Sequence, residues 1–176
     1  MNVPNLLSLI RLALVPIFPV VFFGNHKYSY IYALLVYALA SFTDVLDGFI
    51  ARRYNMVSRT GRILDPLADK LMAFTVLTCI AAARIVPFWA VIIFFCKEAL
   101  MGLGALTLYQ KTEDVMPSNR LGKGAGVFFF LVCCLLLIFP QMPSDWAIFA
   151  ICAALALNII AFFNYFRIFI FTSGKH

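Results

Sequence analysis

Four of the eight acidic residues in this 176-residue chain are aspartates that lie between positions 44 and 69. Asp44 and Asp47 are three residues apart, and Asp65 and Asp69 are four apart, so each pair would occupy one face of a helix. Four carboxylates without clustered His or Cys suit hard divalent cations such as Mg²⁺ or Mn²⁺. Two such ions would balance the four charges, and paired metal ions commonly stabilise the transfer of a phosphoryl group. The sequence therefore predicts metal-dependent chemistry at a phosphate.

Small and basic residues at fixed distances complete the aspartate segment. It reads Asp44-x2-Asp47-Gly48-x2-Ala51-Arg52-x8-Gly61-x3-Asp65-x3-Asp69. Gly48 and Ala51 would leave space beside the metal-binding face, and Gly61 would permit close backbone approach before the third helix. Arg52 could bind a phosphate through two N–H donors. In the alternative interpretation, the local arginines pair with the acids as a solvated loop, but the fixed spacing favours a ligand site.

The chain as a whole has the composition of an integral membrane protein. Hydrophobic residues make up 64% and charged residues 12% of it, and the mean hydropathy is +0.95. A soluble domain carries about twice that share of charge. At ~20 residues per span, the length allows roughly six spans and no separate soluble domain. We therefore expect one domain over residues 1–176, an all-α protein with six transmembrane helices and a polar, metal-containing cavity open to the cytoplasm.

Six apolar stretches mark the expected spans and set their orientation. They run approximately Leu6–Phe23, Ser29–Phe49, Leu64–Ala83, Pro87–Tyr109, Ala125–Phe139 and Trp146–Phe171. Lysine and arginine gather in the second and fourth connections and in the tail, which predicts a multi-pass protein of the cell membrane with both termini cytoplasmic. The net charge of +6 fits contact with anionic lipids, and no basic soluble surface suggests nucleic-acid binding. The five cysteines all lie in apolar stretches, which favours core packing over a disulfide framework.

With every fixed position filled, the aspartate segment resembles the signature of the CDP-alcohol phosphatidyltransferase family. The resemblance implies a six-helix, homodimeric membrane enzyme that binds CDP-diacylglycerol through two metal ions. Such an enzyme transfers the phosphatidyl group to an alcohol and releases CMP. By this resemblance Asp44, Asp47 and Asp65 are metal ligands, and Asp69 is both a ligand and the general base. The implied nucleotide and diphosphate pocket consists of Gly48, Ala51, Arg52, Ser58 and Gly61.

Two short segments are similar to bacterial phosphatidylglycerophosphate synthases. Their Pro-Asn-x-x-(Thr/Ser)-x-x-Arg opening is matched by Pro4-Asn5-Leu6-Leu7-Ser8-Leu9-Ile10-Arg11, and their Asp-Pro-x-Ala-Asp-Lys segment by Asp65-Pro66-Leu67-Ala68-Asp69-Lys70. The resemblance implies that Asn5 and Ser8 help to hold the nucleotide of the CDP-lipid. In the alternative, Asn5 is an N-cap and the first helix merely starts there.

Three cations are candidates for binding an anionic acceptor, glycerol 3-phosphate. Lys97 lies within the fourth apolar stretch, where a lysine is costly unless it faces a polar cavity or partner. Glu98 adjoins it, but successive helical residues are not expected to face each other. Arg120 and Lys123 lie at the cytoplasmic start of the fifth stretch, where ordinary positive-inside topology would also explain them.

The chain departs from the synthase pattern around these cations. The synthases usually have Arg-Glu at the positions of Lys97-Glu98, and Lys-Thr at those of Ala125-Gly126. A related cardiolipin synthase, with phosphatidylglycerol as the acceptor, therefore remains an alternative, because a lipid acceptor needs fewer cations and more apolar space.

Two other classes of protein compete with a phosphatidyltransferase. A transporter or channel would place charges near the bilayer midplane, with broken helices and often inverted repeats. Here the acids flank a cytoplasmic loop, and no repeat is visible. A membrane scaffold would associate through small residues such as Gly102, Gly104, Gly122, Gly124 and Gly126. We expect helix packing to explain several of these glycines. It would not explain the aspartates, so we favour the enzyme.

Overall fold

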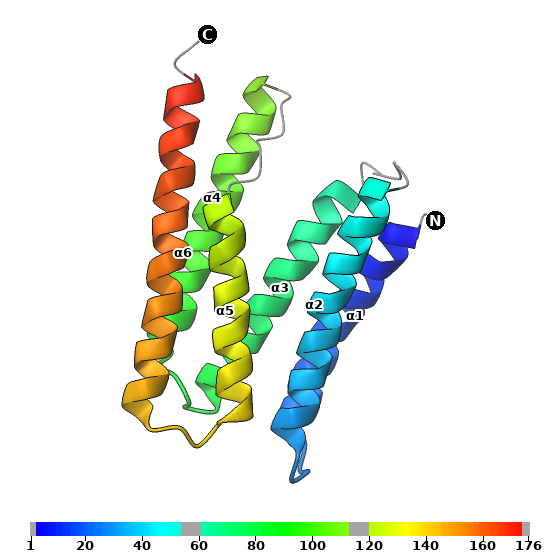
Figure 1. Ribbon diagram of the computed structural model, residues 1–176, viewed down its shortest axis with the longest axis vertical. Helices are drawn as coiled ribbons and strands as arrows, with labels where there is room; N and C mark the ends of the chain where they lie inside the picture. The colour runs from blue at the N-terminus through cyan, green and yellow to red at the C-terminus, as the bar shows by residue number, and fades with distance from the viewer. Residues whose placement is uncertain (1–2, 54–60, 113–119, 174–176) are drawn as a thin grey trace. The chain divides into compact units, whose positions relative to one another are not determined.

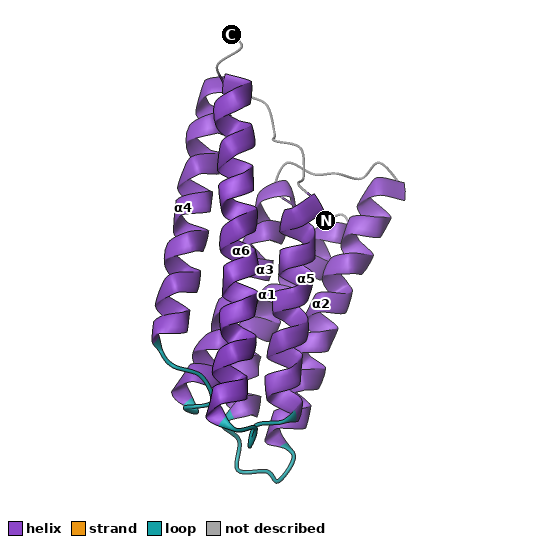
Figure 2. Ribbon diagram, turned by 60° about the vertical axis from the view of Figure 1, so that its left-hand side comes forward, coloured by secondary structure: helices purple, strands orange, loops and turns teal. Residues whose placement is uncertain are grey.

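The computed structural model describes residues 3–53, 61–112 and 120–173, and the regular structure of these ranges is entirely α-helical. Figure 1 shows the helices in chain order: α1 (Val3–Phe22), α2 (Ser29–Arg53), α3 (Gly61–Ala82), α4 (Trp89–Thr112), α5 (Arg120–Ile138) and α6 (Ser144–Ser173). The expected all-α class and the six expected helices are confirmed for this part of the chain. Figure 2 shows the short connections on the ends of the helices.

The helices belong to two compact units. The first unit comprises Met1–Ala83 with Leu137–Pro140, and the second comprises Arg84–Leu136 with Gln141–His176. In the first unit, α1 packs closely against both α2 and α3, and the direct contact between α2 and α3 is smaller. In the second unit, α4 packs against α6. There α5 joins α4 through stacked rings of Phe94 and Phe129, whose centroids are 4.6 Å apart.

Aromatic side chains hold α1 against α2. Phe18 and Phe22 are buried on one face of α1, as their spacing of four residues requires. The ring of Phe18 meets that of Tyr37 edge to face at 6.4 Å, and Phe22 meets Tyr30 at 5.1 Å. Such pairs contribute about 0.5–1.5 kcal/mol each beyond the area that they bury. This face fixes how α1 and α2 are turned toward each other, and so fixes which polar residues meet nearer the start of α1.

Within the described residues, three helices contain segments that are long and apolar enough to cross a membrane. These segments are Ser29–Leu46, Leu121–Ile138 and Ser144–Asn164, and Leu7–Phe22 is a shorter apolar helix. Many large apolar side chains on the helices are exposed, for example Val20 on α1 and Val45 on α2. Lipid would cover such surfaces in a membrane protein. The prediction of six spans is thus supported in length and composition for three helices and stays a prediction for the others.

The helices extend beyond the apolar stretches at the ends that carry basic residues. α2 continues to Arg53, α4 continues to Thr112, and α5 already begins at Arg120. Hydropathy marks only the part of a helix that suits lipid, whereas helical hydrogen bonding continues through polar residues outside it. As a result, Asp44 lies nine residues before the end of α2, which is about 14 Å along the helix axis.

A residue with left-handed backbone geometry follows the end of α3. The Ala83 N–H donates to the Cys79 carbonyl at 2.9 Å, and the next residue, Arg84, has a φ of 60°. An L-residue in this region costs roughly 1–2 kcal/mol, and glycine usually occupies such a position after a helix.

We expect Arg84→Gly to raise the free energy of unfolding by about 0.5–1 kcal/mol, because relief of the backbone strain exceeds the added freedom of glycine in the unfolded chain. Thermal unfolding in detergent micelles would show the gain as a higher Tm. Arg84→Ala is the matched control, since it removes the same exposed charge but keeps a Cβ atom. An equal gain in the alanine variant would assign the effect to the charge.

Candidate active site

Asp44, the first residue of the aspartate segment, forms an ion pair across two helices. Its Oδ1 lies 2.6 Å from Nη1 of Arg11 on α1. The side chain of Arg11 is only 1% exposed, whereas that of Asp44 is 41% exposed. The carboxylate of Asp44 is therefore held from the α1 side by a buried cation and is accessible from another side.

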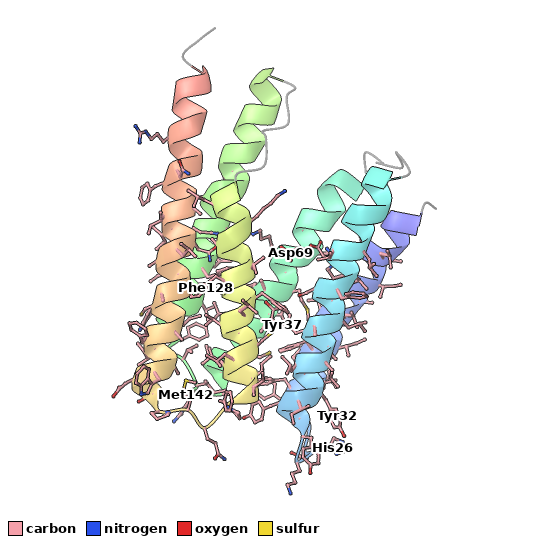
Figure 3. The ribbon with its side chains drawn as sticks, viewed as in Figure 1. His26, Tyr32, Tyr37, Asp69, Phe128 and Met142 are labelled. Atoms are coloured by element: carbon pink, nitrogen blue, oxygen red, sulfur yellow. The ribbon has the colours of Figure 1, made fainter. Side chains whose placement is uncertain are left out.

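The second described aspartate lies at the same end of the first unit. Asp69 is on α3 and its side chain is exposed. Figures 1 and 2 show that the start of α1, the end of α2 and the start of α3 lie at one end of this unit, and Figure 3 shows Asp69 toward this end. Asp44 and Asp69 thus lie on two successive helices of this unit.

The other two aspartates are placed by their backbone alone. Asp47 lies on α2 and Asp65 on α3, and their side chains are outside the described part. Among the side chains that are described, no group of three or more His, Cys, Asp or Glu could hold a metal ion. The predicted set of four donors is chemically suited to Mg²⁺ or Mn²⁺ because all of them are carboxylates. The two-metal site remains a prediction.

Six of the seven residues predicted to hold the CDP-lipid lie on the same three helices. Ser8 is fully buried on α1, three residues from Arg11 and so on the same face. Asn5 lies inside the first turn of α1, which begins at Val3, and this does not support the N-cap alternative. Gly48, Ala51 and Arg52 are on α2, Gly61 opens α3, and Ser58 lies outside the described residues.

Lys97 is the centre of a buried polar network in the second unit. It is 8% exposed, and its Nζ donates to Oδ1 of Asn158 on α6 at 3.2 Å. The same ammonium lies 5.6 Å from the centroid of the Phe94 ring and forms an ion pair with Glu98. The expectation that Lys97 and Glu98 do not face each other is therefore wrong, because two long side chains can curve together even when their Cβ atoms diverge.

Asn158 extends this network to the third helix of the unit. Its Nδ2 donates to the Ala154 carbonyl at 3.0 Å and to the Ala125 carbonyl of α5 at 3.2 Å. Ala125 follows Lys123 by two residues on α5. Lys97 and Lys123, two of the predicted acceptor-binding cations, thus lie in the same unit, on α4 and α5. Lys123 is exposed, and the third, Arg120, is the first residue of α5 with its side chain outside the described part.

Two expectations about small residues need correction. A Cβ atom added at any of the five glycines of α4 and α5 would meet no atom of a neighbouring element within 4 Å in the described part. Packing among the described helices therefore does not explain these glycines. The five cysteines are all free, but core packing describes Cys79 and Cys133 and not Cys96, which is exposed.

Comparison with known proteins supports the family that the aspartate segment resembles. The sequence profile described as CDP-alcohol phosphatidyltransferase matches residues 1–163. The chain belongs to this family. It is therefore an enzyme of phospholipid synthesis in the class of CDP-alcohol phosphatidyltransferases, and the transporter and scaffold alternatives are set aside.

Individual relatives carry two kinds of name. A Bacillus subtilis protein named CDP-diacylglycerol–glycerol-3-phosphate 3-phosphatidyltransferase is 29% identical over 93% of this chain and 89% of its own length. A Streptomyces coelicolor protein named cardiolipin synthase (CMP-forming) is 36% identical over 83% of this chain and 68% of its own. A Mycobacterium tuberculosis protein with a provisional cardiolipin synthase name is 33% identical over 97% and 80%.

In this phosphatidyltransferase, Arg11 and Asn158 bind polar groups on other helices. Neither contact was predicted from the sequence. Arg11 ends the segment that resembles the synthase opening, yet only Asn5 and Ser8 of that segment were given roles. Asn158 was visible as a polar residue inside an apolar stretch. The signal in both cases is a polar side chain that an apolar helix can accommodate only with a partner.

We expect Asn158→Leu to lower the free energy of unfolding by about 1–2 kcal/mol, because the buried Lys97 ammonium loses an acceptor and the Ala125 carbonyl loses a donor. In a double-mutant cycle with Lys97→Met, the double variant should lose less stability than the sum of the single variants, since it leaves no buried cation. Thermal unfolding in detergent measures all four proteins. Asn164→Leu, which changes a less buried residue of the same helix, is the control. Strictly additive losses would show that Lys97 and Asn158 do not act as a pair.

Proposed function

We propose that this chain is a phosphatidylglycerophosphate synthase, which transfers the phosphatidyl group of CDP-diacylglycerol to the hydroxyl of glycerol 3-phosphate and releases CMP. The observation that carries the proposal is the pair of aspartates, Asp44 and Asp69, that α2 and α3 bring to one end of the first unit. Membership of the family supplies the reaction class. The name of the Bacillus subtilis relative, which this chain matches along most of both lengths, supports the choice of acceptor.

The donor side of the reaction needs metal ions and a nucleotide pocket. Two Mg²⁺ or Mn²⁺ ions would be held by Asp44, Asp47, Asp65 and Asp69. When bound, such ions stabilise the negative charge that grows on the diphosphate and on the departing CMP. The residues proposed to hold the CDP-lipid are Asn5, Ser8, Gly48, Ala51, Arg52, Ser58 and Gly61.

Asp69 has the role of general base. Its exposed carboxylate can be reached by an acceptor, whereas Asp44 is held by Arg11. An oxygen of Asp69 takes the proton of the acceptor hydroxyl, and the hydroxyl oxygen forms a bond to the phosphorus that bears diacylglycerol. The bond from that phosphorus to the bridging oxygen breaks, and CMP leaves with the electron pair.

The acceptor side uses the cations of the second unit. Lys97, Arg120 and Lys123 would attract the phosphate of glycerol 3-phosphate. Lys97 is fixed by Asn158 at 3.2 Å and by Glu98, so its charge is held in one place. The alternative acceptor, phosphatidylglycerol, is favoured by the names of the Streptomyces coelicolor and Mycobacterium tuberculosis relatives.

A multi-pass position in the cell membrane is part of the proposal. Trp89 and Trp146 are exposed near the starts of α4 and α6, which lie at one end of the second unit in both Figures 1 and 2. Exposed tryptophans of this kind are typical of the boundary between membrane and water. Arg120 and Lys123 belong to the opposite end, which agrees with cytoplasmic termini. We also propose a homodimer, on the basis of the family resemblance.

The assay for the proposed function is CMP release by the purified protein. We expect release from CDP-diacylglycerol only when Mg²⁺ or Mn²⁺ and glycerol 3-phosphate are both present, with phosphatidylglycerol giving little product. Chelation by EDTA should stop the reaction, and added metal should restore it. Release with phosphatidylglycerol but not glycerol 3-phosphate would replace the proposal with cardiolipin synthesis. No metal-dependent release with any alcohol would reject both.

The role of Asp69 gives a second prediction. Asp69→Asn should lower kcat by at least ~10²-fold, since an amide cannot accept the acceptor proton and general-base catalysis contributes about 10²–10⁴-fold. CMP release measures kcat, and circular dichroism shows whether the helices are retained. Asp145→Asn makes the same chemical change at an exposed residue in the first turn of α6 and should leave the rate unchanged. Near-normal turnover by a folded Asp69→Asn protein would remove Asp69 from the mechanism.

A further inference from the structure

Arg11 is a buried arginine in an otherwise apolar helix. The segment Leu7–Phe22 of α1 is apolar enough to be recognised as a hydrophobic helix, yet Arg11 within it is 1% exposed and is among the largest fully buried side chains. A guanidinium remains charged at any physiological pH, so its burial is costly unless an anion and hydrogen-bond acceptors surround it. The structure places the carboxylate of Asp44 2.6 Å away. The position of Arg11 is therefore tied to Asp44.

The helix that carries Arg11 lies against both aspartate-bearing helices. α1 packs closely against α2, which carries Asp44 and Asp47, and against α3, which carries Asp65 and Asp69. Contact between α2 and α3 themselves is smaller. A cation on the inward face of α1 is thus well placed to offset the mutual repulsion of carboxylates that two neighbouring helices bring together.

Helix packing alone does not require this pair. The aromatic contacts Phe18–Tyr37 and Phe22–Tyr30 already join α1 to α2 farther along the same interface. A buried ion pair generally contributes no more stability than apolar side chains of similar volume. The pair is also asymmetric, because Arg11 is sealed while the Asp44 side chain keeps 41% of its surface exposed. The Asp44 carboxylate thus keeps a surface that a cation could reach, while Arg11 holds it from the buried side.

We propose that Arg11 is a positioning residue for the metal site: it holds the Asp44 carboxylate in the orientation in which Asp44 binds a divalent cation. The inference rests on the proposed function, in which Asp44 is a metal ligand. Arg11 itself touches neither metal nor substrate in this role. Hydrogen-bonding partners of metal ligands commonly fix ligand orientation, and their loss typically weakens metal binding or activity about 10–100-fold.

Direct binding of Mn²⁺ to the purified, substrate-free protein in detergent tests the proposal. Electron paramagnetic resonance of unbound Mn²⁺ measures the dissociation constant without any need for turnover. We expect Arg11→Met to weaken Mn²⁺ binding about 10–100-fold while circular dichroism shows intact helices. Arg11→Gln, which keeps a polar side chain, should show a loss in the same range and decides the question if the methionine variant does not fold. Asp44→Asn should weaken binding at least as much.

The matched control is Arg167→Met, which removes an arginine from an exposed position on α6 and should leave Mn²⁺ affinity unchanged. Wild-type affinity, or tighter binding, in a folded Arg11 variant would overturn the inference, because it would show that Arg11 is only a counter-ion that competes with the metal. That result would leave the proposed function intact. Failure of the wild type both to bind Mn²⁺ and to release CMP would instead reject the proposed function, and the inference with it.

Discussion

Charge buried among apolar helices must be neutralised within reach of its side chain, and this constraint determines how the helices of each unit are turned toward one another. Arg11 and Lys97 are the two buried cations of the described part, at 1% and 8% exposure. Arg11 finds its partner on α2 at 2.6 Å, and Lys97 finds Asn158 on α6 at 3.2 Å. Each of these pairs adds a constraint on helix rotation to that of the aromatic packing within the same unit. A shift of one residue turns a helix by about 100° and would carry Asp44 away from Arg11.

The same constraint places polar residues of the candidate site at one end of the first unit. Along one face of α1, the buried side chains change from Phe22 and Phe18 to Arg11 and Ser8. The aromatic part of this face holds α2 in place, and the polar part meets Asp44. The fold and the candidate site therefore depend on a single helical face. A substitution that rotates α1 would disturb both.

Some of this arrangement is predictable from the sequence because its signals are local. The spacing of Asp44 and Asp47 indicates one helical face, and α2 is indeed helical through both. The partners of the buried cations are not local: Lys97 and Asn158 are 61 residues apart in the chain. Each is recognisable as a polar residue within an apolar stretch, but pairing them requires knowledge of which faces meet. The helix ends were also missed, since Arg53 and Arg120 are helical residues outside the apolar stretches.

The distribution of polar groups between the units bears on the choice of acceptor. All four aspartates of the family segment are in the first unit, whereas Lys97, Asn158 and Lys123 are in the second. Relatives named for different products match this chain at 29% and 36% identity, so membership of the family does not by itself determine the acceptor. Under the proposed function, Lys97, Arg120 and Lys123 are the candidates for choosing between acceptors, and a charge fixed by neighbours suits this role better than a mobile one. Lys97 meets this requirement because α4, α5 and α6 each contribute to the network that holds it.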